Sequence, residues 1–271
     1  MSNGLNPEPQ RNLIERAKVV AADDGRILAA WLVGSFATGQ ADAYSDVDLH
    51  CLISDESADW FREHWAETAT AMAGPLVLAR PIPGTIGGFC LTPDWLHLDL
   101  ILHSRSEFDP HTVAGLEPLY DSSGDLLPKQ TKPRTIVEEP YFPDRTISLC
   151  LYYLGNLPVG VGRGELVFMH GSVVTWRDLL IEVMLAENGI RNRGGNKRLN
   201  PYLTDEQRHV LESIPIPGMD MDHILDYLHA VTREILHRGK SLAQHTATRW
   251  PQDLEDAAMA NVQRHLGLDF H

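Results

Sequence analysis

The sequence has no long hydrophobic run and few cysteines. No apolar stretch among its 271 residues approaches the roughly 20 residues that a transmembrane helix needs. The N-terminus, MSNGLNPEPQRNLIERA, also lacks the apolar core of a secretory signal peptide. The three cysteines, Cys51, Cys90 and Cys150, are far apart and do not have the spacing of a metal site. We therefore expect a cytoplasmic protein whose thiols are free and buried.

Positive charge is also scarce. Lysine and arginine number 23 against 37 aspartates and glutamates, which gives a formal net charge of −14 at pH 7. A protein that binds a nucleic-acid backbone needs a basic surface, so this balance argues against a tRNA-handling enzyme or a DNA-repair polymerase. It is compatible with a cationic small-molecule substrate, although solubility alone explains the acidity of many enzymes.

The most informative stretch spans residues 33–52 and reads VGSFATGQADAYSDVDLHCL. It follows an apolar run, Ile27–Val33, that is typical of a buried strand. Further along, Asp46 and Asp48 alternate with apolar residues, so in a strand both carboxylates point to the same face. Two neighbouring carboxylates repel each other unless a divalent cation lies between them, and Mg²⁺ prefers oxygen ligands of this kind.

The same stretch contains a Gly-Ser pair at the start of an expected short helix. Gly34 allows the backbone to approach a ligand closely, and the free N–H groups of a first helical turn favour an anion such as a phosphate. The residue pattern resembles the motif of nucleotidyltransferases of the DNA polymerase β superfamily. The residues that carry the resemblance are Val33, Gly34, Ser35, Gly39, Ser45, Asp46 and Asp48. An ordinary strand–turn–strand with an acidic surface edge is the alternative.

A third carboxylate lies in the apolar run of residues 96–102, LHLDLIL. Three leucines share one face of this expected strand, while His97 and Asp99 share the other. A carboxylate in so apolar a strand is costly without a partner. In the superfamily that the sequence resembles, a carboxylate from a later, adjacent strand serves as third metal ligand or general base, and the resemblance gives this role to Asp99. A solvent-facing Asp99 is the alternative, with Asp94 and Glu107 as weaker candidates for the role.

Prolines mark a change in the character of the chain. Four of them in the segment LPKQTKPRTIVEEPYFP predict a stiff, extended connector. We predict an α+β protein, in which residues 1–130 form a nucleotidyltransferase domain with a mixed sheet flanked by helices. Residues 131–143 are then the Pro-rich connector and residues 144–271 a helical-bundle domain. Helices are expected at about 7–24, 58–73, 145–160, 172–188, 204–214, 221–237 and 251–266, and strands at 27–33, 46–53, 76–81, 89–91 and 96–102.

Two features of the helical half suggest ligand contacts. Asp178 and Glu182 lie on one stripe of an otherwise apolar helix, with Trp176 close by, which suggests an acidic wall for an amine-bearing substrate. An ordinary exposed face explains the stripe equally well. The segment RNRGGNKR contains four basic residues in eight, and its two glycines allow a tight loop around an anion. Lys197 and Arg198 are the candidates for the β- and γ-phosphates, unless this is simply a solvated basic loop after a helix end.

Within the superfamily, the sequence is similar to the aminoglycoside and lincosamide adenylyltransferases, which confer antibiotic resistance. Phe36 and the segment GQADAYSDVDL are particularly similar to the lincosamide type, although that type is looser at the second acidic position, here Asp48. The resemblance implies transfer of AMP from ATP to a hydroxyl of a small molecule, with one or two Mg²⁺ ions, by a monomer or homodimer that binds neither nucleic acid nor membrane. A nucleotidyltransferase acting on a protein or RNA target, and an inactive nucleotide-binding module, are the alternatives.

Overall fold

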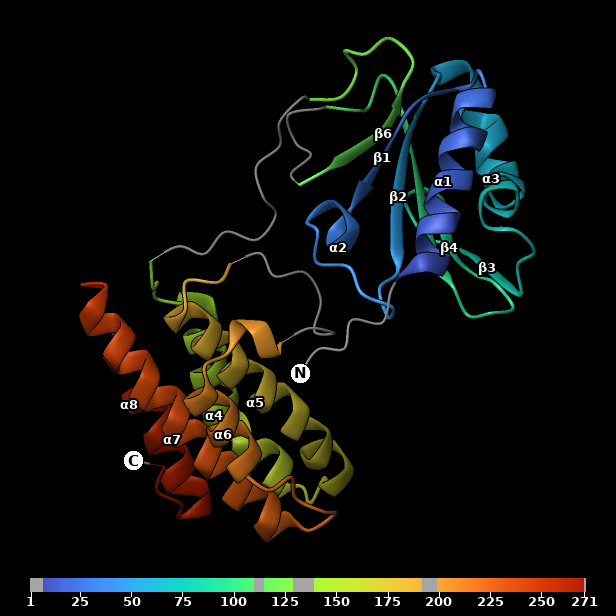
Figure 1. The fold of residues 1–271 in the computed structure, drawn as a ribbon. Coiled ribbons are helices and arrows are strands. Elements are labelled where there is room, and N and C mark those ends of the chain that lie inside the picture. The colour runs from blue at the N-terminus through green and yellow to red at the C-terminus, as the bar shows by residue number, and fades with distance from the viewer. Residues whose placement is uncertain (1–6, 110–114, 129–138, 192–198, 271) are drawn as a thin grey trace. The chain divides into compact units, whose positions relative to one another are not determined.

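The computed structural model of this chain describes residues 7–109, 115–128, 139–191 and 199–270 (Figure 1). The contacts within the chain divide it into two compact units, residues 1–134 and 135–271. The predicted Pro-rich connector, 131–143, lies mostly outside the described residues, as do Lys197 and Arg198. Among the helices of the described residues, none is both long and apolar enough to cross a membrane.

The first unit is a six-stranded mixed sheet with helices. Its elements are α1 (Glu8–Asp23), β1 (Ile27–Val33), α2 (Gly34–Ala37), β2 (Val47–Ile53), α3 (Ala58–Ala73), β3 (Leu78–Pro81), β4 (Ile86–Leu91), β5 (His97–Ser104) and β6 (Glu117–Asp121). The strand order is β3-β4-β5-β2-β1-β6. The β2–β5 pair is parallel and the other pairs are antiparallel. The helices α1, α2 and α3 alternate with β1 and β2, the strands β3 to β6 then follow one another, and the predicted α+β architecture is confirmed.

The two faces of this sheet carry different side chains. On β2, Val47, Leu49 and Cys51 are fully buried, and on β5 the leucines at 98 and 100 are too. They form the main core with α1 and α3, which Figure 1 shows on the same side of the sheet. The alternate residues of β2 and β5 point to the opposite face and include the acidic residues. A smaller core around Trp31 covers part of that face.

The second unit is helical in its described parts. It contains α4 (Asp144–Gly162), α5 (Leu166–Glu187), α6 (Asp205–Ser213), α7 (Met221–His245) and α8 (Gln252–Leu266). These helices enclose a core of their own. The helix α5 begins at Leu166 rather than at the predicted Ser172, whose hydroxyl donates to the Met169 carbonyl oxygen inside the helix instead of capping it.

The helix α7 also extends further than predicted, to His245 instead of residue 237. The sequence prediction ended this helix shortly before Gly239. In the structure Gly239 is a contact point, because a Cβ there would lie 2.7 Å from the Ile147 side chain and 3.0 Å from that of Trp250. The glycine therefore allows α7 to pack closely against its neighbours without ending the helix.

The three cysteines are free and buried, as predicted. Burial raises the pKa of the Cys51 and Cys150 thiols to about 12. Burial, together with the charge of Asp99, raises the pKa of Cys90 to about 11. All three thiols therefore stay protonated near neutral pH and act as small apolar side chains.

Candidate active site

The predicted carboxylates come together on two neighbouring strands. In the parallel pair of β2 and β5, Asp48 lies directly opposite Asp99. Side chains at paired positions of neighbouring strands project from the same face of a sheet. Both aspartates lie on the face opposite α1 and α3, and Asp46 comes just before β2 begins. The structure therefore groups the three acidic residues on which the sequence analysis converged.

Gly34 brings the chain backbone against one of these carboxylates. Val33 is paired with Asp48 in the antiparallel pair of β1 and β2, so the turn after β1 starts beside this carboxylate. Gly34 has a φ of +68°, and a Cβ built there would lie 2.2 Å from Asp48 Oδ2. Only glycine fits both this backbone conformation and this space.

Ser35 presents a buried hydroxyl, whose Oγ makes no hydrogen bond with the residues that the structure describes. A buried polar atom of this kind is costly unless a ligand or water completes it. The helix α2 has only four residues, so its contribution to an anion site is this hydroxyl and the close backbone approach at Gly34, not a helix dipole.

His97 lies among the carboxylates, although the sequence analysis did not count it as a site residue. Its Nε2 is 2.9 Å from Asp99 Oδ1, and its Nδ1 is 4.0 Å from Asp46 Oδ2. The Phe89 ring packs edge-on against the imidazole, with 6.0 Å between ring centroids. The alternation in LHLDLIL gave the face that His97 shares with Asp99, but not a contact that depends on side-chain rotamers.

Ser45 has a structural role that the motif did not reveal. Its hydroxyl accepts a hydrogen bond from the Asp42 backbone N–H at 2.9 Å, and its carbonyl oxygen accepts one from the Gln10 amide at 3.2 Å. These bonds close the turn before β2 and tie it to α1. Ser45 therefore shapes the loop that leads to Asp46, and the contact of Ser45 with nucleotide, which the resemblance to nucleotidyltransferases implies, stays a prediction.

The described residues contain no group of three or more His, Cys, Asp or Glu side chains arranged to hold a metal ion on their own. Mg²⁺ is usually held by one or two carboxylates together with waters and substrate phosphates, not by an all-protein cage. Asp46 and Asp48, with the Gly34 backbone against the Asp48 carboxylate, fit an ion that shares its ligands with a phosphate group. The donor set thus suits the predicted cofactor.

In the second unit, the residues predicted to contact substrate lie in different environments. Trp176 is 1% exposed within the helical core, so packing in that core accounts for its indole. Asp178 is exposed and Glu182 is partly exposed on α5. Lys197 and Arg198 lie outside the described residues.

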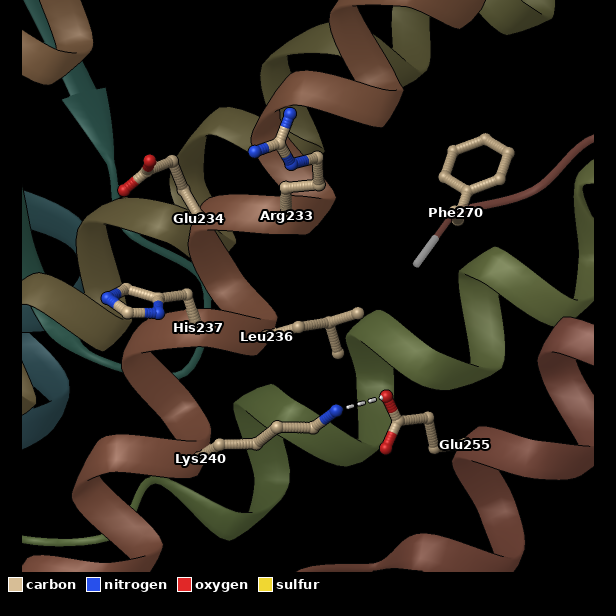
Figure 2. A pocket seen from close by; sticks show the side chains of 7 residues that line it. All are labelled: Arg233, Glu234, Leu236, His237, Lys240, Glu255 and Phe270. Atoms are coloured by element: carbon tan, nitrogen blue, oxygen red, sulfur yellow. Dashed lines mark hydrogen bonds and ion pairs between the residues drawn. The ribbon is translucent and has the colours of Figure 1, made fainter.

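A cavity of about 470 Å³ also lies in the second unit. It is lined by Arg233, Glu234, Leu236, His237, Lys240, Glu255 and Phe270 (Figure 2). The buried Glu255 carboxylate at its wall accepts hydrogen bonds from Lys240 Nζ and Trp250 Nε1, each at 2.7 Å. The buried charge of this cavity is therefore already compensated, and none of the predicted substrate-binding residues lines it.

Comparison with known proteins agrees with the geometry of the first unit. Residues 14–71 match the model of the family described as nucleotidyltransferase domain. This segment of the first unit is similar to a nucleotidyltransferase domain. The match spans Gly34, Ser35, Asp46 and Asp48 but ends before Asp99, so the place of the third carboxylate rests on the β2–β5 register and not on the family match.

Two solved structures of nucleotidyltransferases resemble the chain weakly. An aminoglycoside 6-adenyltransferase from Bacillus subtilis shares 16% identity at a TM-score of 0.34, with 92% of this chain and 97% of that chain covered. A STING-associated CdnE c-di-GMP synthase from Capnocytophaga granulosa shares 13% identity at a TM-score of 0.31, with 90% and 84% covered. None of the curated proteins gives a significant match. Likenesses at this level carry no information about the substrate.

Proposed function

We propose that the protein is a Mg²⁺-dependent nucleotidyltransferase that transfers AMP from ATP to a hydroxyl group of a small, cationic molecule, of the aminoglycoside or lincosamide kind. The observation that carries the proposal is the pairing of Asp48 with Asp99 across β2 and β5, with the Gly34 backbone against the Asp48 carboxylate. Asp46, Asp48 and Asp99 are the proposed catalytic residues.

In this reaction, the oxygen of the acceptor hydroxyl attacks the α-phosphorus of ATP. The new P–O bond forms as the bond to the β-phosphate oxygen breaks, and pyrophosphate leaves. Asp99 accepts the proton of the hydroxyl, since it is a carboxylate held in place beside the phosphate-binding residues. Gly34 and Ser35 bind phosphate oxygens through the close backbone and the buried hydroxyl.

Asp46 and Asp48 are the residues that would hold Mg²⁺ together with the triphosphate. When bound, the ion would neutralise phosphate charge and make the α-phosphorus more electrophilic. Without it, the adjacent carboxylates would repel the triphosphate, because like charges destabilise each other at short range. Lys197 and Arg198 remain our proposed partners of the β- and γ-phosphates.

The cationic character of the acceptor is proposed from charge. The chain has a net charge of −14, and α5 presents the exposed Asp178 and the partly exposed Glu182. These carboxylates suit the amino groups of an aminoglycoside or lincosamide. A cognate protein or RNA modified by the enzyme in place of these compounds would instead favour the regulatory kind of nucleotidyltransferase.

Substitution of Asp99 tests its role. We expect Asp99→Asn to lower the rate of pyrophosphate release about 100-fold or more, because loss of a general base costs on this order. The matched control is Asp94→Asn, in the exposed turn before β5, which should retain wild-type turnover. A large loss in the Asp94 variant, with turnover retained in the Asp99 variant, would move the third carboxylate to Asp94 and contradict the assignment.

A further inference from the structure

His97 connects carboxylates from two parts of the chain. The imidazole projects from β5, where its Nε2 meets Asp99 Oδ1 at 2.9 Å, and its other nitrogen lies 4.0 Å from Asp46 Oδ2, just before β2. All three side chains are about 30% exposed, so the contacts form at the edge of the protein interior. Electrostatic contacts in such partly buried places are stronger than on an open surface.

The Asp99 carboxylate depends on this contact. Its Oδ1 is buried and makes no hydrogen bond of standard geometry within the described residues, and the imidazole nitrogen of His97 is the polar atom that meets it. A buried carboxylate oxygen without a polar neighbour is costly, and the side chain would rotate to reach water. Such a rotation is also favoured by repulsion from Asp48, which lies opposite on β2.

The imidazole is itself held in place. Phe89 of β4 is paired with Asp99 and packs its ring edge-on against His97. This packing limits the orientations of the imidazole, since aromatic rings favour this edge-to-face arrangement. With the imidazole beside Oδ1, the second oxygen of Asp99 is the one left to accept a proton from a hydroxyl.

We propose that His97 is a positioning residue that fixes the orientation of the Asp99 carboxylate for proton acceptance from the acceptor hydroxyl. The inference rests on the proposed function and adds to it a residue that lies outside the family's matched segment, residues 14–71. The function of His97 is carried by Nε2, which faces Asp99, and not by Nδ1, which faces Asp46.

Three substitutions at His97 separate these two nitrogens. Glutamine is long enough to place an amide N–H where Nε2 lies, whereas asparagine reaches only the position of Nδ1, and alanine reaches neither. We expect His97→Ala and His97→Asn to lower kcat by about 10- to 100-fold, the usual range for a residue that orients a site ligand. The KM for ATP should stay unchanged, and His97→Gln should regain most of the lost kcat.

His64 on α3 provides the matched control for loss of a histidine from the same unit. Its Nδ1 bonds the Trp60 carbonyl oxygen, away from the carboxylates, and His64→Ala should keep wild-type kcat. Equal activity of the His97 glutamine and asparagine variants, or full kcat in His97→Ala, would overturn the proposal.

A second measurement does not depend on activity. The melting temperature of the ligand-free protein is compared for wild type, His97→Ala, Asp99→Asn and the double variant. If the side chains of His97 and Asp99 are coupled, the change in melting temperature of the double variant differs from the sum of the changes of the two single variants. Additive effects would contradict the contact. If wild-type protein transfers no nucleotide, the proposed function fails, and this cycle still decides whether His97 holds Asp99.

Discussion

Gly34 shows how closely one residue ties the fold to the site. Its φ of +68° requires a left-handed backbone, and the space where a Cβ would lie is taken by Asp48 Oδ2, 2.2 Å away. Gly39, in the same turn region, has a similar φ of +70° but no atom within 4 Å of the Cβ position. The two glycines therefore share a backbone requirement and differ in their contact with the site.

This difference gives a matched pair of substitutions. Gly34→Ala and Gly39→Ala should each lower the free energy of unfolding by about 1–2 kcal/mol, because a left-handed backbone is unfavourable for alanine. Only Gly34→Ala displaces the Asp48 carboxylate, and we expect it to lower kcat/KM about 100-fold. Chemical denaturation and pyrophosphate release measure the two effects. Equal activity in the two variants would show that the Gly34–Asp48 contact does not matter for catalysis.

Individual residues also show the limits of prediction from sequence. The alternation of apolar and acidic residues predicted that Asp46 and Asp48 share a strand face, and the resemblance to the superfamily implied that Asp99 joins them from a neighbouring strand. The hydrogen bonds by which Ser45 closes its turn were not predicted, because they depend on the loop geometry and not on the motif. The burial of Trp176 was not predicted, because an almost wholly apolar helix does not reveal which side faces the core.

At the scale of elements, the sheet face that carries the carboxylates also carries a partly buried histidine pair. His50 Nδ1 and His103 Nε2 are 2.9 Å apart, and the His103 ring stacks on Trp31 and packs against Phe108. Burial lowers the pKa of His103. The pair exists because β2 and β5 are neighbours in parallel, a pairing between segments about 50 residues apart that hydrophobic periodicity alone does not predict.

The lowered pKa of His103 predicts how stability depends on pH. The unfolded chain binds a proton at this site near pH 6.5 and the folded protein at a lower pH, so stability is fully present above about pH 6.5 and falls as the pH decreases below it. The lowered pKa values of Asp24 and Asp55 change the stability of the fold only below about pH 4, where these carboxylates begin to be protonated in the unfolded chain. We expect the melting temperature to fall between pH 7 and pH 5, and to fall less in His103→Gln. An identical fall of the melting temperature between pH 7 and pH 5 in this variant would show that His103 is not the cause of the pH dependence.

At the scale of the whole chain, the buried side chains form separate cores in the two units. The main cluster of the first unit and its smaller cluster around Trp31 lie within residues 13–127, and the cluster of the second unit lies within residues 147–270. The Pro-rich segment and the change from strands to helices predicted this change of architecture. The sequence did not predict that Glu255 of α8 is buried and bonded to Lys240 and Trp250. Lys240 lies on another helix, α7, and Trp250 lies in the segment before α8, so no local pattern brings these residues together.

The separate cores predict two unfolding transitions in calorimetry, since units with their own cores need not unfold together. Lys240→Met removes a partner of the buried Glu255 carboxylate and should lower the free energy of unfolding of the second unit by roughly 2–3 kcal/mol. The transition of the first unit should not move. Lys18→Met on α1 is the control for loss of a lysine elsewhere. A single transition that shifts as a whole would contradict independent unfolding of the units.

We propose that the site formed by the carboxylates of β2 and β5 catalyses transfer of a nucleotidyl group from ATP to a small molecule. The most direct test incubates the protein with ATP, Mg²⁺ and a panel of aminoglycosides and lincosamides, and measures the mass of each acceptor. We predict one acceptor heavier by an adenylyl group with wild-type protein and unmodified with Asp48→Asn, together with matching pyrophosphate release. Unmodified acceptors throughout the panel, or an acceptor still modified by the folded Asp48→Asn variant, would contradict the proposed function of this site.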